Sequence, residues 1–193
     1  MKILLPITIS VLTYPAFAEG MRKLDSHEHG VGKLNIAIEG SQIAMELVAP
    51  GADIVGFEHS AETAEDRAAI KAALTILETP LELFGMSTDA DCRVEGAHAD
   101  LDGDEDHEGH DHDTAHDHAS GHDDHEDEAG HTEFHAEYSM TCDTPSALTD
   151  IAFDYFDVFE NAREVEVQIV TPTGATAVEV TRDAPTLDMR DLF

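Results

Sequence analysis

The chain has 193 residues and is strongly acidic, with 42 Asp and Glu against 10 Lys and Arg, a formal net charge of −32 and a pI near 4.3. This charge excludes nucleic acids and anionic membrane surfaces as expected partners, because both bind positive patches. It favours solubility and the attraction of cations. The length suits one core rather than two domains.

The N-terminal residues 1–18, MKILLPITISVLTYPAFA, combine Lys2, a short apolar run and Ala16-Phe17-Ala18. This is the pattern of a secretory signal peptide that is cleaved after Ala18. A buried strand or a membrane anchor is the alternative, but the run is short for a transmembrane helix and contains two prolines. We therefore predict a soluble protein exported to a bacterial periplasm, with one mature domain over 19–193.

Residues 31–49 predict a β-hairpin, because apolar and polar residues alternate on both sides of Gly40-Ser41. A two-residue turn at that point fixes which apolar residues face each other. The expected pairs are Leu34 with Leu47, Ile36 with Met45, and Ile38 with Ile43. Both strands then share one apolar face, which we expect to lie on the core.

Residues 61–78 predict a helix with Ser60 as its N-cap, acidic residues in its first turns and a stop at Thr79-Pro80. Its buried stripe consists of apolar residues at helical spacing, namely Ile70, Ala73, Leu74 and Leu77. A short helical turn is then expected to pack against the core through Leu81, Leu83 and Phe84.

The only cysteines, Cys92 and Cys142, predict a disulfide in an oxidising compartment, with two free buried thiols as the alternative. Strands 92–101 and 132–142 can pair antiparallel with the cysteines opposite each other. The remaining expected pairs are Val94 with Met140, Gly96 with Tyr138, and His98 with Ala136. The disulfide would then fasten the stem of the intervening segment, and on the chain-entropy account it stabilises the fold by about 3–4 kcal/mol.

That intervening segment, at about 102–131, is composed mainly of Asp, Glu, Gly and His and has almost no large apolar side chain. It cannot bury enough surface to offset its ordering entropy, which predicts a disordered loop. Imidazole binds zinc, copper and nickel, so the tract predicts metal binding without selecting the metal. A solvated charge run does not account for its eight histidines, which are His107, His110, His112, His116, His118, His122, His125 and His131.

The C-terminal part predicts a second hairpin around the turn Thr171-Pro172-Thr173-Gly174. Its alternating apolar residues are Val165, Val167, Ile169, Val178 and Val180. The segment before it supplies further core residues at a spacing that fits either a helix or a compact turn, namely Leu148, Ile151, Phe153, Phe156 and Phe159. Together the elements predict an α+β fold, mainly an antiparallel sheet of hairpins with one or two packed helices.

The histidines outside the tract suggest a second metal site, in the folded core. His27 and His29 have the same strand parity and project to one face if extended. With His59 they can supply the nitrogen ligands of a tetrahedral zinc site. Further candidate ligands are Glu58, His135 and His98. The alternatives are that each histidine is an exposed surface residue and that His98 faces the core.

Three segments carry a family resemblance. They are His27-Glu28-His29-Gly30-Val31-Gly32-Lys33-Leu34, then Pro50-Gly51-Ala52-Asp53-Ile54-Val55-Gly56-Phe57-Glu58-His59, and Phe134-His135-Ala136-Glu137-Tyr138 with Cys142. Over nearly the whole mature chain the sequence resembles the zinc-regulated protein A (ZrgA-like) family of His-rich periplasmic zinc-binding proteins. The resemblance implies a role in zinc acquisition beside a zinc ABC importer. Such proteins often have Pro soon after Gly-Phe-Glu-His, whereas Ser60-Ala61 follows here, which removes no ligand.

Two functional classes follow. The first is a zinc-binding protein, not an enzyme, in which the tract captures zinc and the core holds it. The second is a secreted metalloenzyme with a metal-loading loop, although neither a His-Glu-x-x-His nor a Gly-x-Ser-x-Gly motif is present. A copper or nickel buffer is a variant of the first class.

Overall fold

The structure is a computed structural model that describes residues 28–102 and 131–190. The predicted signal peptide and most of the histidine tract lie outside these residues. The strands are β1 (Val31–Glu39), β2 (Gln42–Pro50), β3 (Phe84–Met86), β4 (Cys92–Asp102), β5 (Glu133–Cys142), β6 (Asp150–Phe153), β7 (Glu164–Thr171), β8 (Gly174–Thr181) and β9 (Thr186–Asp188). The helices are α1 (Gly51–Ile54), α2 (Ala64–Leu77), α3 (Pro80–Leu83) and α4 (Tyr155–Val158), with short 3-10 turns η1 (Thr88–Ala90) and η2 (Pro145–Ala147).

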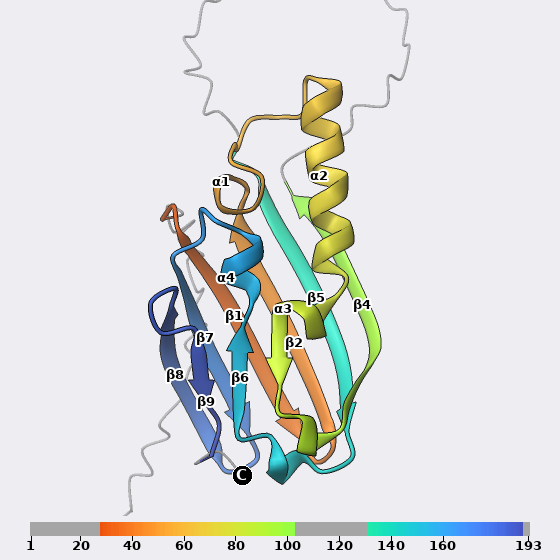
Figure 1. The fold of residues 1–193 in the computed structure, drawn as a ribbon, viewed down its shortest axis with the longest axis vertical. Coiled ribbons are helices and arrows are strands. Elements are labelled where there is room, and N and C mark those ends of the chain that lie inside the picture. Colours follow the sequence, from red (N-terminus) through yellow and green to blue (C-terminus); the bar gives the residue numbers. More distant parts are fainter. Residues whose placement is uncertain (1–27, 103–130, 191–193) are drawn as a thin grey trace, which may run out of the picture.

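Two sheets face each other across the core. The larger has the strand order β4-β5-β2-β1-β7-β8, and the smaller has the order β3-β6-β9. The smaller sheet and the short helices α3 and α4 lie over one face of the larger sheet (Figure 1). All pairs are antiparallel except β1 with β7, which run parallel. The predicted α+β class, a sheet of hairpins with few helices, is confirmed.

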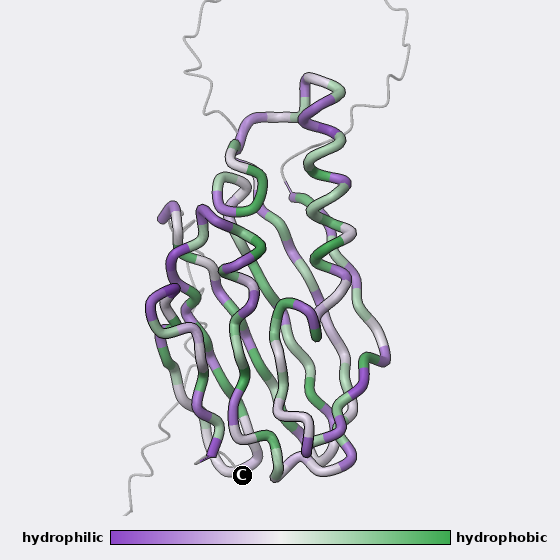
Figure 2. Tube along the Cα trace, viewed as in Figure 1, coloured by the Kyte–Doolittle hydropathy of each residue, from purple (hydrophilic) through white to green (hydrophobic). Residues whose placement is uncertain are grey.

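The core lies between the sheets and is rich in aromatic side chains. Apolar and polar residues alternate along β1, β2, β5 and β7 (Figure 2), and one face of each of these four strands is buried. The opposite layer contributes a cluster of stacked and edge-on rings, namely Phe84, Phe153, Tyr155, Phe156 and Phe159. The expected core segment before the second hairpin is therefore confirmed, and it forms strand β6 followed by the single turn α4.

The other two predicted hairpins are both present. The β1–β2 pairing has the predicted register, with Ile38 opposite Ile43 across the Gly40-Ser41 turn. The β7–β8 hairpin is also present, although Val178 is exposed because β8 is an edge strand.

The predicted register of the β4–β5 stem is correct only at its cysteine end. Cys92 pairs with Cys142 and Val94 with Met140, but a bulge then shifts the register between Val94 and Gly96. As a result Gly96 faces Ser139 and His98 faces Glu137, not the predicted Tyr138 and Ala136. One extra residue in β4 moves every later partner by one position.

Helix α2 begins later than predicted. Its N-cap is Thr63, not Ser60: Thr63 Oγ1 accepts a hydrogen bond from the Asp66 amide at 3.0 Å, and the Thr63 amide donates to Asp66 Oδ2 at 2.9 Å. This reciprocal capping box satisfies two amides at once, which a cap at Ser60 does not do here. In the next turn Leu83 and Phe84 are buried as expected, while Leu81 is exposed.

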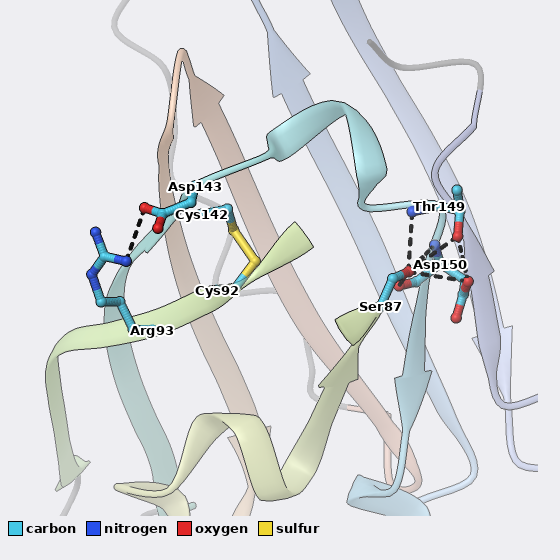
Figure 3. The surroundings of a disulfide bond; sticks show 7 residues. All are labelled: Ser87, Cys92, Arg93, Cys142, Asp143, Thr149 and Asp150. Atoms are coloured by element: carbon cyan, nitrogen blue, oxygen red, sulfur yellow. Dashed lines mark hydrogen bonds and ion pairs between the residues drawn. A yellow bond between two sulfur atoms is a disulfide. The ribbon is translucent and has the colours of Figure 1, made fainter. Parts of the chain in front are cut away.

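The predicted Cys92–Cys142 disulfide is present and joins the start of β4 to the end of β5 (Figure 3). An ion pair of 2.9 Å between Arg93 and Asp143 flanks it. The cysteines lie at one end of the strand pair, and Asp102 and Glu133 lie at the other. At about 3.4 Å per residue the two ends are about 30 Å apart.

The helices of the described part of the chain are too short or too polar to cross a bilayer.

Candidate metal centre

A carboxylate and two imidazoles meet where β1 begins, β2 ends and β5 begins. Glu58 Oε2 lies 3.1 Å from His29 Nε2 and 2.6 Å from His131 Nδ1. The Glu58 side chain is only 12% exposed, whereas the two rings are 64% and 63% exposed. We call these three residues the Glu58 cluster. Its carboxylate is held within the protein, and its imidazoles face solvent.

Helix α1 positions the first imidazole. Asp53, which is 2% exposed, accepts a hydrogen bond from the Gly30 amide at 2.7 Å through Oδ1. The Gly30 carbonyl in turn accepts hydrogen bonds from the amides of Arg163 and Glu164, both at 2.9 Å. Gly30 has a φ of 92°, a conformation that glycine adopts without steric cost. Hydrogen bonds to both the amide and the carbonyl of Gly30 therefore fix the segment that carries His29.

The same helix positions the second imidazole. The Gly51 amide donates to the Thr132 carbonyl at 2.8 Å, and Thr132 is itself buried. A Cβ on Gly51 would lie 2.7 Å from the Phe57 carbonyl and 3.1 Å from the Thr132 carbonyl, so only glycine fits without displacement. Because Phe57 and Thr132 are the neighbours of Glu58 and His131, this close packing sets the distance between the carboxylate and the ring.

Electrostatics keep Glu58 ionised. Burial raises the pKa of Glu58, but hydrogen bonds from His131 and His29 outweigh it, and the net pKa is lowered. The opposite balance holds at Asp53, where burial outweighs the Gly30 hydrogen bond and the pKa is raised. Among the described residues neither Glu58 Oε1 nor Asp53 Oδ2 has a hydrogen-bond partner, although both atoms are buried. The cluster therefore presents a charged carboxylate with one oxygen still uncommitted.

The cluster has the donor types of a zinc site, but not yet its geometry. In residues 28–102 and 131–190 no group of three or more His, Cys, Asp or Glu side chains is already arranged around a common metal position. Two ligand atoms about 2.0–2.1 Å from a tetrahedral zinc are about 3.3 Å apart. The His29 distance is close to that value, while the His131 distance is that of a hydrogen bond and has to lengthen by about 0.7 Å.

The structure distributes the other candidate ligands as follows. His59 stacks on Phe57 and its Nδ1 lies 2.9 Å from the Ser60 carbonyl, so it does not join Glu58. His135 is half-buried near Asp102 and Glu133, and His98 is exposed, not in the core. His27 and the seven tract histidines His107, His110, His112, His116, His118, His122 and His125 lie outside the described residues.

Sequence reasoning grouped His131 with the tract and overlooked Asp53 and Thr132. The signal for Asp53 was a carboxylate within an otherwise apolar segment directly after a buried strand. Such a residue is rarely buried without a partner. No local pattern indicates the Thr132 contact, because it joins segments 81 positions apart.

The family model for zinc uptake proteins matches most of the chain. It is described as "ZrgA family zinc uptake protein" and matches residues 26–189. The chain therefore belongs to the ZrgA family, as the resemblance in the sequence indicated, and it has a role in zinc uptake. This is a family of uptake proteins, not of enzymes. A search of curated proteins finds no match.

Proposed function

We propose that this protein is a periplasmic zinc carrier that collects zinc with its histidine tract, holds it at the Glu58 cluster and supplies a zinc ABC importer. The observation that carries the proposal is a buried, ionised carboxylate placed between two exposed imidazoles. His131 is the last histidine of the tract, so the cluster lies where the tract joins the fold.

The division of labour follows from the cost of ordering the ligands. Glu58, His29 and His131 are already close together, so zinc binding there requires only small side-chain movements. Preorganisation of this kind lowers the cost of binding. The composition of the tract predicts ligands that must be ordered at each site, so we expect them to bind zinc more weakly. The strong negative charge of the chain raises the local cation concentration for both.

Zinc titration of the full chain, with competition by a chelator of known affinity, tests the proposal. The substitution Glu58→Gln keeps the side-chain shape but removes the charge, and the double substitution of His29 and His131 by Ala removes both rings. Each variant should lose one tight equivalent and retain the weaker ones. Binding of the tight equivalent should also weaken below about pH 6, where protons compete for imidazole.

His59→Ala is the matched control, because it removes an exposed imidazole next to Glu58 that stacks on Phe57 and lies 2.9 Å from the Ser60 carbonyl. It should leave the tight equivalent unchanged. Removal of residues 103–130 should leave the tight equivalent and abolish the weaker equivalents that the tract binds. If that removal abolishes all binding, the protein is a tract-only chelator and the proposed cluster does not hold zinc.

A further inference from the structure

The outer face of the β4–β5 ribbon carries a second set of metal-ligating side chains. At its end distant from the disulfide, three successive cross-strand pairs on one face are composed entirely of His, Asp and Glu. They are His98 with Glu137, Asp100 with His135, and Asp102 with Glu133. The intervening residues Ala99, Phe134 and Ala136 face the core, so this face is the one that the small sheet does not cover.

His135 is the centre of this set. Its Nε2 lies 3.5 Å from Asp102 Oδ2 and 3.8 Å from Glu133 Oε2, beyond hydrogen-bond distance. The side chain is 29% exposed, but the Nε2 atom itself is inaccessible to solvent and has no hydrogen-bond partner among the described residues. A ring nitrogen that is shielded from water, lies within 4 Å of two carboxylates and makes no hydrogen bond is a position that a bound cation would stabilise.

The charges around this nitrogen favour a cation. Carboxylates directly opposite each other on neighbouring strands repel, as Asp102 and Glu133 do. One imidazole nitrogen and two carboxylate oxygens form a donor set that zinc accepts. The three side chains are not yet arranged around a common metal position. For a tetrahedral zinc with ligand atoms about 3.3 Å apart, the two carboxylates would have to approach the ring nitrogen by about 0.2 and 0.5 Å and also close on each other.

We propose that His135, Asp102 and Glu133 form a second zinc site, on the open face of the sheet and separate from the Glu58 cluster. Asp102 is the last described residue before the histidine tract, so this site lies next to the tract in the chain. The site would serve as a second acceptor for zinc that the tract releases. This adds a site to the proposed function but does not depend on the Glu58 cluster being correct. With two carboxylates and one ring it should bind zinc more weakly than a site with two imidazoles.

Nuclear magnetic resonance of histidine ring nitrogens in the full chain, titrated with zinc chloride, tests the site. The His135→Gln variant assigns the His135 signals. At zinc saturation, His135 Nε2 should show the shift of a metal-bound nitrogen. In the Asp102→Asn, Glu133→Gln double variant the same shift should require roughly tenfold more zinc or be absent.

The matched control is the Glu166→Gln, Glu179→Gln double variant. These residues are also directly opposite each other on the outer face, on β7 and β8, so the change in charge is the same. The control should titrate like the unchanged chain. If His135 stays metal-free at saturation, or if both double variants lose the shift equally, the second site is refuted. The His29 and His131 signals report separately on the Glu58 cluster, so each site can fail alone.

Discussion

Replacing Gly51 by alanine tests whether helix α1 sets the geometry of the Glu58 cluster. The new Cβ would lie 2.4 Å from Thr132 Oγ1 and within 3.1 Å of the carbonyl oxygens of Phe57 and Thr132. The hydroxyl can rotate away, but the carbonyls belong to the backbone. The backbone segments that carry Glu58 and His131 must therefore move away from residue 51. Gly51 does not have a positive φ, so the whole cost arises from crowding.

Crowding of this kind costs about 1–3 kcal/mol. In a domain of this size each kcal/mol lowers the melting temperature by about 2–4 °C. The displacement also moves the Glu58 carboxylate relative to the His131 ring, and loss of such support typically weakens metal binding by about 10- to 100-fold. Thermal unfolding of the metal-free protein and chelator-competition titration with zinc measure the two effects.

Gly40→Ala provides the control for stability without a change at the cluster. Gly40 has a φ of 61° and no atom within 4 Å of an added Cβ. Alanine there costs about 1 kcal/mol through the backbone alone. Its zinc affinity should equal that of the unchanged chain. If Gly51→Ala is destabilised but also keeps full affinity, α1 does not position the ligands and the reasoning is wrong.

Three further predictions concern stability and processing. Asp53→Ala should cost about 1–3 kcal/mol because it leaves the buried Gly30 amide without an acceptor, whereas Asp53→Asn retains one. Burial raises the pKa of Asp53, so the unchanged chain loses stability as the pH rises through that pKa. In urea unfolding, the stability of Asp53→Asn relative to the unchanged chain should therefore be greater at pH 7 than at pH 3. Joint substitution of Cys92 and Cys142 by Ala should cost about 4 kcal/mol in denaturant unfolding, since the bridge closes a loop of 50 residues, yet leave zinc affinity unchanged. Mass spectrometry of exported protein should show Glu19 as the first residue, and an intact Met1 would contradict signal cleavage.

The sequence predicts elements well where one local rule decides them. The β1–β2 register follows from strict alternation and a two-residue turn. The start of α2 depends on two competing caps, and the carboxylate of Asp66 decides it, because it can return a hydrogen bond to Thr63. Gly96 within a predicted strand is a sign of a bulge, and the register shifts directly before it, between Val94 and Gly96.

The candidate metal centre could be predicted only in part, because its three side chains come from distant segments. His29 and Glu58 could be grouped because both lie in short motifs between predicted elements, one before the first strand and the other before the helix. His131 could not be added, since its position depends on the Gly51–Thr132 hydrogen bond. The parallel pairing of β1 with β7, which places Arg163 and Glu164 against Gly30, is equally invisible to local patterns.

Under the proposed function, the hydrogen bonds within the Glu58 cluster bear on zinc release as well as on zinc binding. Glu58 is paired with His29 and His131, and these contacts keep the three side chains together. A zinc ion would have to replace both contacts, and their loss would offset part of the coordination energy. A protein that only stored zinc would gain from ligands without such competing partners. Under the proposed function the competition is useful, because it preserves the arrangement of the site for the next ion and limits the affinity that an importer has to overcome.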